Sequence, residues 1–257
     1  MSDDILLFEK TGTVATVTLN RPEKMNSFDP ALCQAMTERV AAIEDDDEIR
    51  VVILRGAGRC FSAGADLSAE RKGPASFHIE RAYKTFLTSI AASEKIWIAQ
   101  VHGACAGGGA GVAMTCDLMV MSDDAYVYMA FAAIALVPDL GNCQALLSAM
   151  GYRRALQAAL EGRKMPAEEC LSHGIANKVV AKDDLDAETT AWAESLAARA
   201  PLSLGATKRL LRTVGAMSFG DSISAESREQ MTLLKTEDFR EGVRAFFAKE
   251  KPAFKGR

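Results

Sequence analysis

The sequence predicts an α/β fold followed by a helical region, on the strength of three patterns. TVATVTLN, residues 13–20, alternates apolar and polar residues as a half-buried strand does. RVVILRG, residues 50–56, is a continuous β-branched run, which is typical of a strand covered on both faces. Between them, residues 27–46 carry apolar side chains at helical spacing. The order strand, helix, strand favours parallel pairing with a right-handed crossover.

The segment SFDPALCQAMTERVAAIEDD, residues 27–46, predicts an amphipathic helix. Asp29 before Pro30 is a start signal, because proline is favoured in the first turn of a helix. One stripe of the helix is apolar and is expected to face the sheet. It consists of Leu32, Met36, Val40 and Ile43.

The strand and helix patterns then recur along the chain. A helix at about 82–93 leads into IWIAQVHG, and a glycine-led helix at about 109–116 leads into DLMVMSD, after which AYVYM adds a short extended piece. From about Gly141 helical patterns dominate, apart from a short NKVVA. We expect an α/β core over residues 1–200 and a C-terminal helical oligomerisation region over residues 201–257.

Composition and charge exclude several classes of function. The chain has 257 residues and a formal net charge of -4, which gives no general attraction to nucleic acid or to anionic membranes. No apolar run approaches the ~18 residues of a membrane span, and MSDDILLFEK lacks the cationic start of a signal peptide. We therefore expect a cytoplasmic protein with neither a nucleic-acid nor a membrane partner.

Cysteine and histidine spacing gives no metal site. The six cysteines are scattered without C-x-x-C spacing, and there are three histidines, His78, His102 and His173. Buried, reduced thiols are the simpler interpretation. A Cys–His nucleophile pair stays open, since such residues meet in space rather than in sequence.

Two small-residue loops are the candidate site. HGACAGGGAGVAMTCD, residues 102–117, places three glycines before an apolar helix pattern, and GAGRCFSAGADL, residues 56–67, follows the strand at 50–56. Dinucleotide, phosphate-loop and G-x-S-x-G signatures do not fit either loop. Backbone N–H groups of two such loops can converge on one carbonyl oxygen. The alternative is that both are tight strand-to-helix turns.

These motifs, together with ALVPDLG and the ending EDFREGVRAFFAKEKPAFKG, resemble the crotonase family, also called the enoyl-CoA hydratase/isomerase superfamily. The resemblance runs from LNRPEKMNSF to the last residues. It implies a crotonase-like core of repeated ββα units, a C-terminal helical trimerisation region and an acyl-CoA thioester as substrate. No separate cofactor is expected, because coenzyme A is part of the substrate.

The resemblance also assigns residues to a site. It implies that the N–H groups of Ala65 and Gly108 hold the thioester oxygen, with Gly108 admitting the substrate against the backbone. It further implies that Ala63, Leu67 and Gly109 border the substrate. Asp66 belongs to the same motif, and two roles for it stay open, contact with the ligand or support of the loop.

The sequence departs from the hydratases of this family at two positions. Where they carry two glutamates, this chain has Gly111 and, by ungapped alignment back from Pro138, Phe131. Asp139 is the remaining candidate for acid–base chemistry, and its alternative role is an N-cap for the helix that follows. Phe131, which we place at the substrate, and Ala132 would raise the pKa of Asp139 if they bury it.

A lone carboxylate with an enolate-stabilising site predicts an enoyl-CoA isomerase. The alternatives are an enoyl-CoA hydratase, in which Glu70 or Glu80 supplies a second acid, and a catalytically silent acyl-CoA-binding homologue. A dehalogenase would use Asp139 as nucleophile with a histidine near position 84, where this chain has Lys84. The segment at 69–86 is expected to shape the acyl pocket.

Cations and apolar side chains near the ends of the chain suggest further contacts. Lys24 matches a family position near coenzyme A, and Lys251, with Lys249 and Lys255, could reach a phosphate from a neighbouring subunit. Five apolar residues of the C-terminal part either pack back on the core or bury a face between subunits, and we expect the second, in a homotrimer or a dimer of trimers. They are Leu233, Leu234, Phe246, Phe247 and Phe254.

Overall fold

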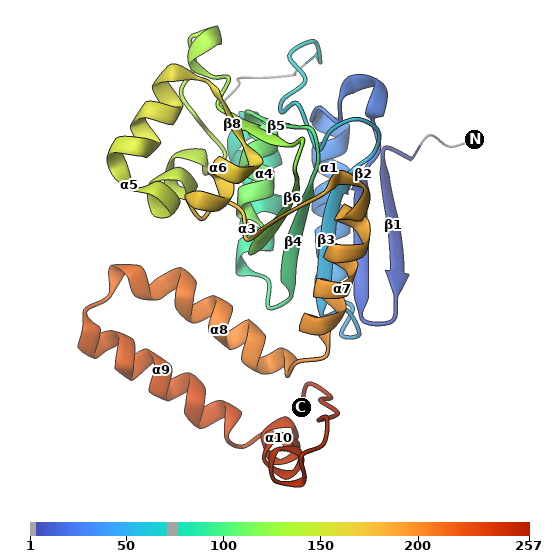
Figure 1. Cartoon of the computed structure of the whole chain (residues 1–257), viewed down its shortest axis with the longest axis vertical. Helices are drawn as coiled ribbons and strands as arrows, with labels where there is room; N and C mark the ends of the chain where they lie inside the picture. Colours follow the sequence, from blue (N-terminus) through green and yellow to red (C-terminus); the bar gives the residue numbers. More distant parts are fainter. Residues whose placement is uncertain (1–3, 71–76) are drawn as a thin grey trace.

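Two β-sheets form the core of the protein, in a computed structural model that describes residues 4–70 and 77–257. The larger sheet has the order β1-β2-β3-β4-β6-β9 (Figure 1). Its strands are β1 (Leu6–Thr11), β2 (Val14–Leu19), β3 (Val51–Gly56), β4 (Ile96–Val101), β6 (Leu118–Ser122) and β9 (Lys178–Val180). From β2 to β9 all pairs are parallel, as predicted, whereas β1 pairs antiparallel with β2. The strand β1 had not been predicted.

Helices cover both faces of this sheet, which explains the unbroken apolar run of β3. Val52 and Leu54 belong to the core cluster under α1 (Pro30–Glu44) and α3 (Lys84–Ala92). The alternate residues Val51 and Ile53 belong to a second cluster with α7 (Leu185–Ala197). Successive side chains of a strand point to opposite faces, so every position of a doubly covered strand must be apolar.

The start of α1 is as predicted. The Asp29 Oδ1 atom accepts a hydrogen bond of 2.8 Å from the N–H of Leu32, and Pro30 is the first residue of the helix. The predicted stripe is buried against the sheet. This pairing of cap and stripe sets the register of α1 on the sheet.

A second, smaller sheet positions the glycine-rich helix. Its order is β5-β7-β8, with β5 parallel to β7 and β7 antiparallel to β8. These strands are β5 (Ala104–Ala106), β7 (Tyr126–Tyr128) and β8 (Lys164–Pro166). β5 runs directly toward α4 (Gly108–Thr115), so the sheet fixes where this helix begins. Three residues are too few for a readable alternation, and β5 and β8 were not predicted.

The remaining helices lie in the C-terminal part, where helical patterns dominate the sequence, although no pattern predicted the helix over residues 219–233. After Gly141 comes α5 (Asn142–Glu161), which is interrupted at Gly151, whose φ of 73° is not helical. The others are α6 (Ala167–Ser172), α8 (Pro201–Thr213), α9 (Phe219–Leu233) and α10 (Glu237–Ala248). Short helical turns lie at η1 (Pro22–Lys24), η2 (His78–Tyr83), η3 (Ala132–Ile134), η4 (Lys182–Asp184) and η5 (Val214–Ala216). No helix within the described ranges is long and apolar enough to span a bilayer.

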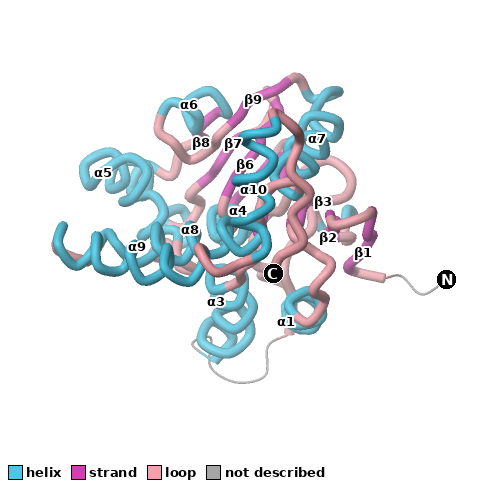
Figure 2. The backbone as a smooth tube through the Cα atoms, turned by 90° about the horizontal axis from the view of Figure 1, so that it is seen from below, coloured by secondary structure: helices cyan, strands magenta, loops and turns pink. Residues whose placement is uncertain are grey.

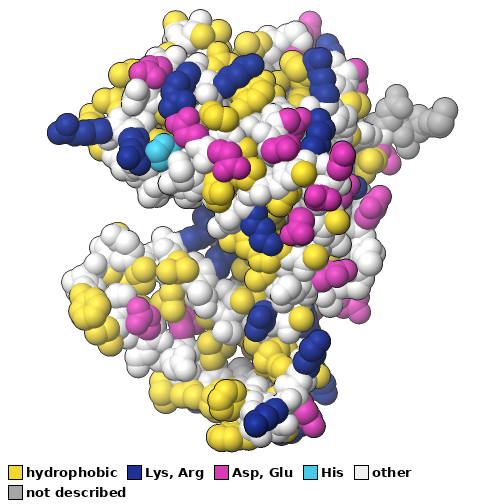
Figure 3. Space-filling view, in the orientation of Figure 1, with side chains coloured by type: hydrophobic (Ala, Val, Ile, Leu, Met, Phe, Trp, Pro, Cys, Tyr) yellow, Lys and Arg dark blue, Asp and Glu magenta, His cyan; other side chains and the backbone are white. Residues whose placement is uncertain are grey.

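Helices α8, α9 and α10 form a lobe below the sheets in Figure 1, and Figure 2 shows this lobe from below. Apolar side chains gather on this lobe in the space-filling view of Figure 3. Phe246 and Phe247 are 78% and 79% exposed, and Leu234 is also exposed. Leu233 and Phe254 are half-buried. The single chain therefore leaves most of the predicted apolar face uncovered.

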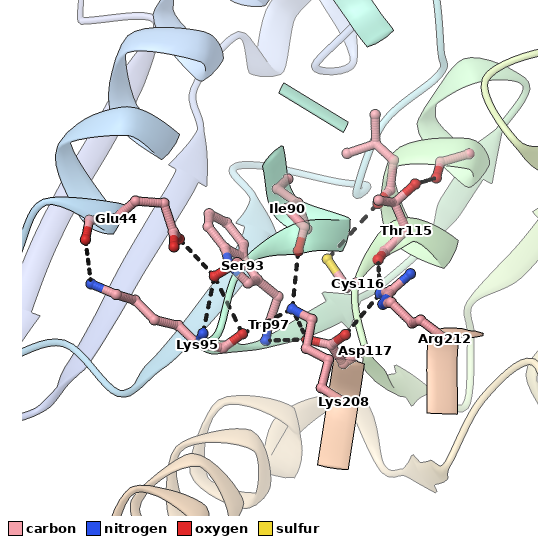
Figure 4. A network of polar contacts seen from close by, with 12 residues as sticks. Glu44, Ile90, Ser93, Lys95, Trp97, Thr115, Cys116, Asp117, Lys208 and Arg212 are labelled. Carbon is pink, nitrogen blue, oxygen red and sulfur yellow. Dashed lines mark hydrogen bonds and ion pairs between the residues drawn. The ribbon is translucent and has the colours of Figure 1, made fainter. Parts of the chain in front are cut away.

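A buried ion pair joins this lobe to the core (Figure 4). The Lys208 ammonium of α8 lies 2.8 Å from the Asp117 carboxylate and donates to the carbonyl oxygens of Ile90 and Lys95. Arg212, one turn further on, lies 2.8 Å from the other oxygen of Asp117. Burial lowers the pKa of Lys208, because removal from water disfavours its charged form.

Replacing Lys208 with alanine should destabilise the protein by about 3 kcal/mol, because it removes the buried partner of Asp117 and leaves that carboxylate paired with the more exposed Arg212. Chemical denaturation measures this loss. The control is Lys182→Ala, which removes a surface pair with Asp124. Equal stabilities for the two variants would show that Lys208 does not hold the lobe.

Candidate active site

Backbone pairing brings the two small-residue loops together. Ser62 pairs with Cys105 in a parallel bridge between the loops. The N–H of Ser62 donates to Ala104 O at 3.1 Å, and the N–H of Ala106 donates to Ser62 O at 2.9 Å. The segment that follows Ser62 is therefore held beside the start of α4.

The N–H of Ala65 is directed by a second bridge, with Phe28. Phe28 N–H donates to Gly64 O at 2.7 Å, and Asp66 N–H donates to Phe28 O at 2.9 Å. Ala65 lies between Gly64 and Asp66, the two residues that bond to the backbone of Phe28. In a parallel bridge of this kind, the N–H of the middle residue points away from the partner strand. The Ala65 N–H thus points away from Phe28.

The N–H groups of Ala65 and Gly108 lie close together. A Cβ atom built on Gly64 would lie 2.9 Å from Gly108 N, and one built on Gly108 would lie 3.7 Å from Ala65 N. Neither N–H donates to any residue in the described part of the chain. Gly108 is also the first residue of α4, where helix N–H groups lack intrahelical partners and the helix dipole is positive. Two adjacent donors in this state form a site for a carbonyl oxygen that acquires negative charge.

The neighbouring glycines serve different purposes. Gly107 has a φ of 51°, which turns the chain from β5 into α4. A Cβ atom on Gly109 would lie 2.7 Å from the Ser62 side chain, and one on Gly111 would lie 2.7 Å from Leu140 O. Gly109 and Gly111 are thus places where other parts of the chain approach α4 closely.

Asp66 supports the loop. Its Oδ1 atom accepts from the hydroxyl and the N–H of Ser68 at 2.6 and 3.0 Å, and its Oδ2 atom lies 3.4 Å from Arg21 Nη2. These contacts, the Ser68 hydroxyl foremost, hold the pKa of Asp66 below its usual value. Of the two roles left open for Asp66, the contacts support the structural one. Ala63 is fixed similarly, since its N–H donates to Met25 O at 2.9 Å.

Asp139 lies in the segment that crosses the start of α4. A Cβ atom on Gly108 would lie 2.9 Å from Leu140 Cδ1, so the side chain of the residue after Asp139 lies against Gly108. The N-cap of α5 is Gly141, without a side-chain cap, so the Asp139 carboxylate does not cap this helix. Asp139 is half-buried, and its Oδ1 atom is shielded from solvent.

Phe131 lies beside Gly107, which is in the turn between β5 and α4. Its Cζ atom would be 3.9 Å from a Cβ atom on Gly107, and its side chain is 6% exposed. Ala132, in contrast, is exposed. The expected rise in the pKa of Asp139 stays a prediction.

A cavity of about 660 Å³ opens one turn along α4 from Gly108, large enough for a small-molecule ligand. Its lining includes Gly111 and Leu140 but neither Ala65 nor Gly108. Elements from distant parts of the chain contribute, namely η2, α3, α4, α5 and α8, through residues such as Ile79, Lys84, Leu87, Met114, Ser148 and Arg212. Residues 71–76 of the segment expected to shape an acyl pocket lie outside the described residues.

Other predicted residues lie apart from the two amides. Leu67 is 70% exposed, and Lys24 and Lys251 are exposed. The tail that carries Lys251 lies at the end of the molecule opposite β5 in Figure 1. Glu80 forms a surface pair with Lys84 at 2.7 Å, and Glu70 is exposed. No group of histidine, cysteine and acidic side chains within residues 4–70 and 77–257 could hold a metal ion.

Comparisons with known proteins match this architecture over nearly the whole chain. A family model described as enoyl-CoA hydratase/isomerase matches residues 9–257. The chain belongs to the enoyl-CoA hydratase/isomerase family. It is therefore an acyl-CoA-metabolising enzyme with the crotonase fold, as the sequence motifs led us to expect.

The relatives of this family member include proteins named as isomerases and proteins named as hydratases. It is 34% identical over 250 residues to 1,2-epoxyphenylacetyl-CoA isomerase of Escherichia coli, covering 95% of each chain. It is also 34% identical over 252 residues to (E)-benzylidenesuccinyl-CoA hydratase of Thauera aromatica, covering 96% of this chain and 98% of that one. A crystal structure of enoyl-CoA hydratase from Bacillus anthracis matches with a TM-score of 0.93 at 27% identity, covering 99% of this chain and 100% of that one.

Two side chains of this family member, Asn142 and Ser62, make contacts that were not anticipated from the sequence. Asn142 is fully buried and donates from Nδ2 to Gly107 O at 3.1 Å and to Asp139 O at 2.8 Å. Ser62 donates from its hydroxyl to Asn26 O at 2.8 Å and accepts from Gly64 N–H at 3.1 Å. Asparagine is common at the start of a helix, where it caps the helix. The sequence therefore does not indicate that Asn142 contacts the glycine-rich loop.

A side chain added at Gly108 should lower turnover while the fold persists, and a larger side chain should lower it more. Its Cβ would meet the end of the flexible Leu140 side chain, so the protein can adjust, but the substrate would lose its approach to the amides. Because loss of one oxyanion donor costs about 100-fold in rate, Gly108→Val should lose at least that much and Gly108→Ala less. Steady-state kinetics and thermal midpoints measure both effects. Near-normal turnover in Gly108→Val would count against the site.

Proposed function

We propose that the protein is an enoyl-CoA isomerase that shifts a C=C bond by proton transfer through an enolate. The observation that carries this proposal is the adjacency of two main-chain donors, Ala65 N–H and Gly108 N–H, which have no acceptor among the described residues, with Asp139 in the segment next to them. Donors preorganised where charge develops stabilise an enolate, and a single carboxylate can move the proton.

The positions of the two hydratase glutamates support isomerisation over hydration. At Gly111 a Cβ atom would lie 2.7 Å from Leu140 O and 3.0 Å from Asn142 Nδ2, so the packed segment leaves no room for a longer side chain. Phe131 is buried and apolar. Water activation by two carboxylates thus lacks both residues, while Asp139 remains.

In the proposed reaction the Asp139 carboxylate removes a proton from the α-carbon of a 3-enoyl-CoA. The electron pair of that C–H bond forms a double bond between the α-carbon and the carbonyl carbon, and the C=O π pair moves onto the thioester oxygen, which is held by Ala65 and Gly108. The protonated Asp139 then returns the proton two carbons away, and the double bond moves to the 2,3 position. No proton is gained or lost overall.

The names of two relatives agree with this proposal. One is the isomerase of Escherichia coli, and another, 29% identical over 266 residues, is a peroxisomal Δ(3,5)-Δ(2,4)-dienoyl-CoA isomerase of Arabidopsis thaliana. The assay mixes the protein with 3-enoyl-CoA and 2-enoyl-CoA and follows thioester conjugation by ultraviolet absorbance. Interconversion supports the proposal; water addition indicates a hydratase, and binding without change indicates a silent homologue.

We further propose that the enzyme is a homotrimer or a dimer of trimers. The exposed apolar side chains of α10, among them Phe246 and Phe247, would be buried between copies. Lys24 and the distant Lys251 would then meet coenzyme A phosphates from different subunits. None of the six cysteines forms a disulfide within the described part of the chain, which suits a reducing compartment such as the cytoplasm.

Asp139→Asn should abolish proton exchange at the substrate α-carbon, because an amide cannot act as the base. Incubation of an acyl-CoA in deuterium oxide, followed by mass spectrometry, measures the exchange. Affinity for the acyl-CoA should change little, since Ala65 and Gly108 bind through their main chains. Full exchange in the variant would refute the role of Asp139.

A further inference from the structure

Asn142 connects the oxyanion loop to the segment that carries Asp139. It is the first residue of α5 and is fully buried. Its Nδ2 atom donates to Gly107 O at 3.1 Å and to Asp139 O at 2.8 Å. Both partners are carbonyl oxygens, so the nitrogen of the amide must face them rather than the oxygen. One side chain thus fixes two backbone segments relative to each other.

The contact with Gly107 acts on the oxyanion donor itself. The carbonyl of Gly107 and the N–H of Gly108 belong to the same planar peptide group, in which they point in opposite directions. A carbonyl held toward Asn142 therefore turns the Gly108 N–H to the other side. In addition, a hydrogen bond to the carbonyl oxygen polarises the peptide and strengthens its N–H as a donor.

Further donors converge on the Gly107 carbonyl. The N–H groups of Ala110 and Gly111 donate to it at 3.1 and 3.3 Å, from the first turn of α4. Asn142 adds a donor from outside the helix. The peptide that ends in the Gly108 N–H is therefore both held in place and polarised.

Stability alone does not account for Asn142. Its Oδ1 atom is buried and accepts no hydrogen bond from the residues that the structure describes. An unsatisfied buried acceptor destabilises a fold. Only the Nδ2 group of the amide forms hydrogen bonds among the described residues, and it donates to the carbonyls of Gly107 and Asp139.

We propose that Asn142 is a positioning residue, which orients and polarises the Gly107–Gly108 peptide and ties it to the Asp139 segment. The proposal rests on the proposed function, in which that peptide holds the thioester oxygen. Asn142 does not touch the substrate. It acts through the Gly108 N–H and through the backbone of Asp139.

The test compares Asn142→Ala with Thr189→Val. Thr189 is a matched control, because it is also fully buried, its Oγ1 atom has no hydrogen-bond partner among the described residues, and it lies on α7. Asn142→Leu is a second variant of nearly the original shape, in case the alanine variant folds poorly. The probe is a cinnamoyl-CoA, whose absorbance shifts to longer wavelength when the thioester carbonyl is polarised.

In Asn142→Ala we expect a smaller red shift of bound cinnamoyl-CoA and a kcat about tenfold lower, less than the loss of a whole donor. The KM and the thermal midpoint should change little. Thr189→Val should match the wild type in all four measurements. A structural role for Asn142 would instead lower the thermal midpoint and leave the red shift unchanged.

A full red shift and an unchanged kcat in both Asn142 variants would overturn the proposal. So would a kcat that falls while the red shift stays complete, because the peptide would then be polarised without Asn142. A wild-type protein that neither shifts the probe nor isomerises enoyl-CoA would instead refute the proposed function. The two failures are therefore distinguishable.

Discussion

The convergence of two backbone loops at Ala65 and Gly108 is the constraint on which the site depends. It is set by main-chain pairing, through the Ser62–Cys105 bridge between the loops and the Phe28–Ala65 bridge behind them. Because the donors are peptide groups, no side chain at these two positions performs the chemistry. The sheets hold the donors, and the dipole of α4 adds to the potential at Gly108.

Close packing around α4 decides which reactions the site can support. Glycines at 109 and 111 let Ser62 and Leu140 approach the helix, and Asp139 directly precedes Leu140 in the chain. The same approach fills the space that a side chain at position 111 would need. In the proposed site, the glycine at position 111 and the position of the Asp139 segment thus follow from one packing arrangement.

The fold was largely predictable, because it follows from patterns several residues long. The apolar stripe of α1, its Asp29 cap and the doubly covered strand β3 all have local signals. The strands β5 and β8 do not, since each has three residues and is defined by its partners. The antiparallel edge strand β1 was also not predicted.

The site was predictable in part. Ala65 and Gly108 came from motif resemblance, and the structure brings them together. Their support was not predicted, because the contacts of Asn142, Ser62 and Arg21 join segments far apart in sequence. Residue types indicate what a side chain can donate or accept, whereas only the fold determines which carbonyl it meets.

The central claim is that two peptide N–H groups stabilise negative charge on a thioester oxygen. Isotope-edited infrared spectroscopy of an acyl-CoA labelled with ¹³C at the thioester carbonyl measures this directly. We predict a carbonyl stretch at lower frequency when the ligand is bound than when it is free in water. A stretch at the free-ligand frequency, with the ligand shown to be bound, would contradict the account.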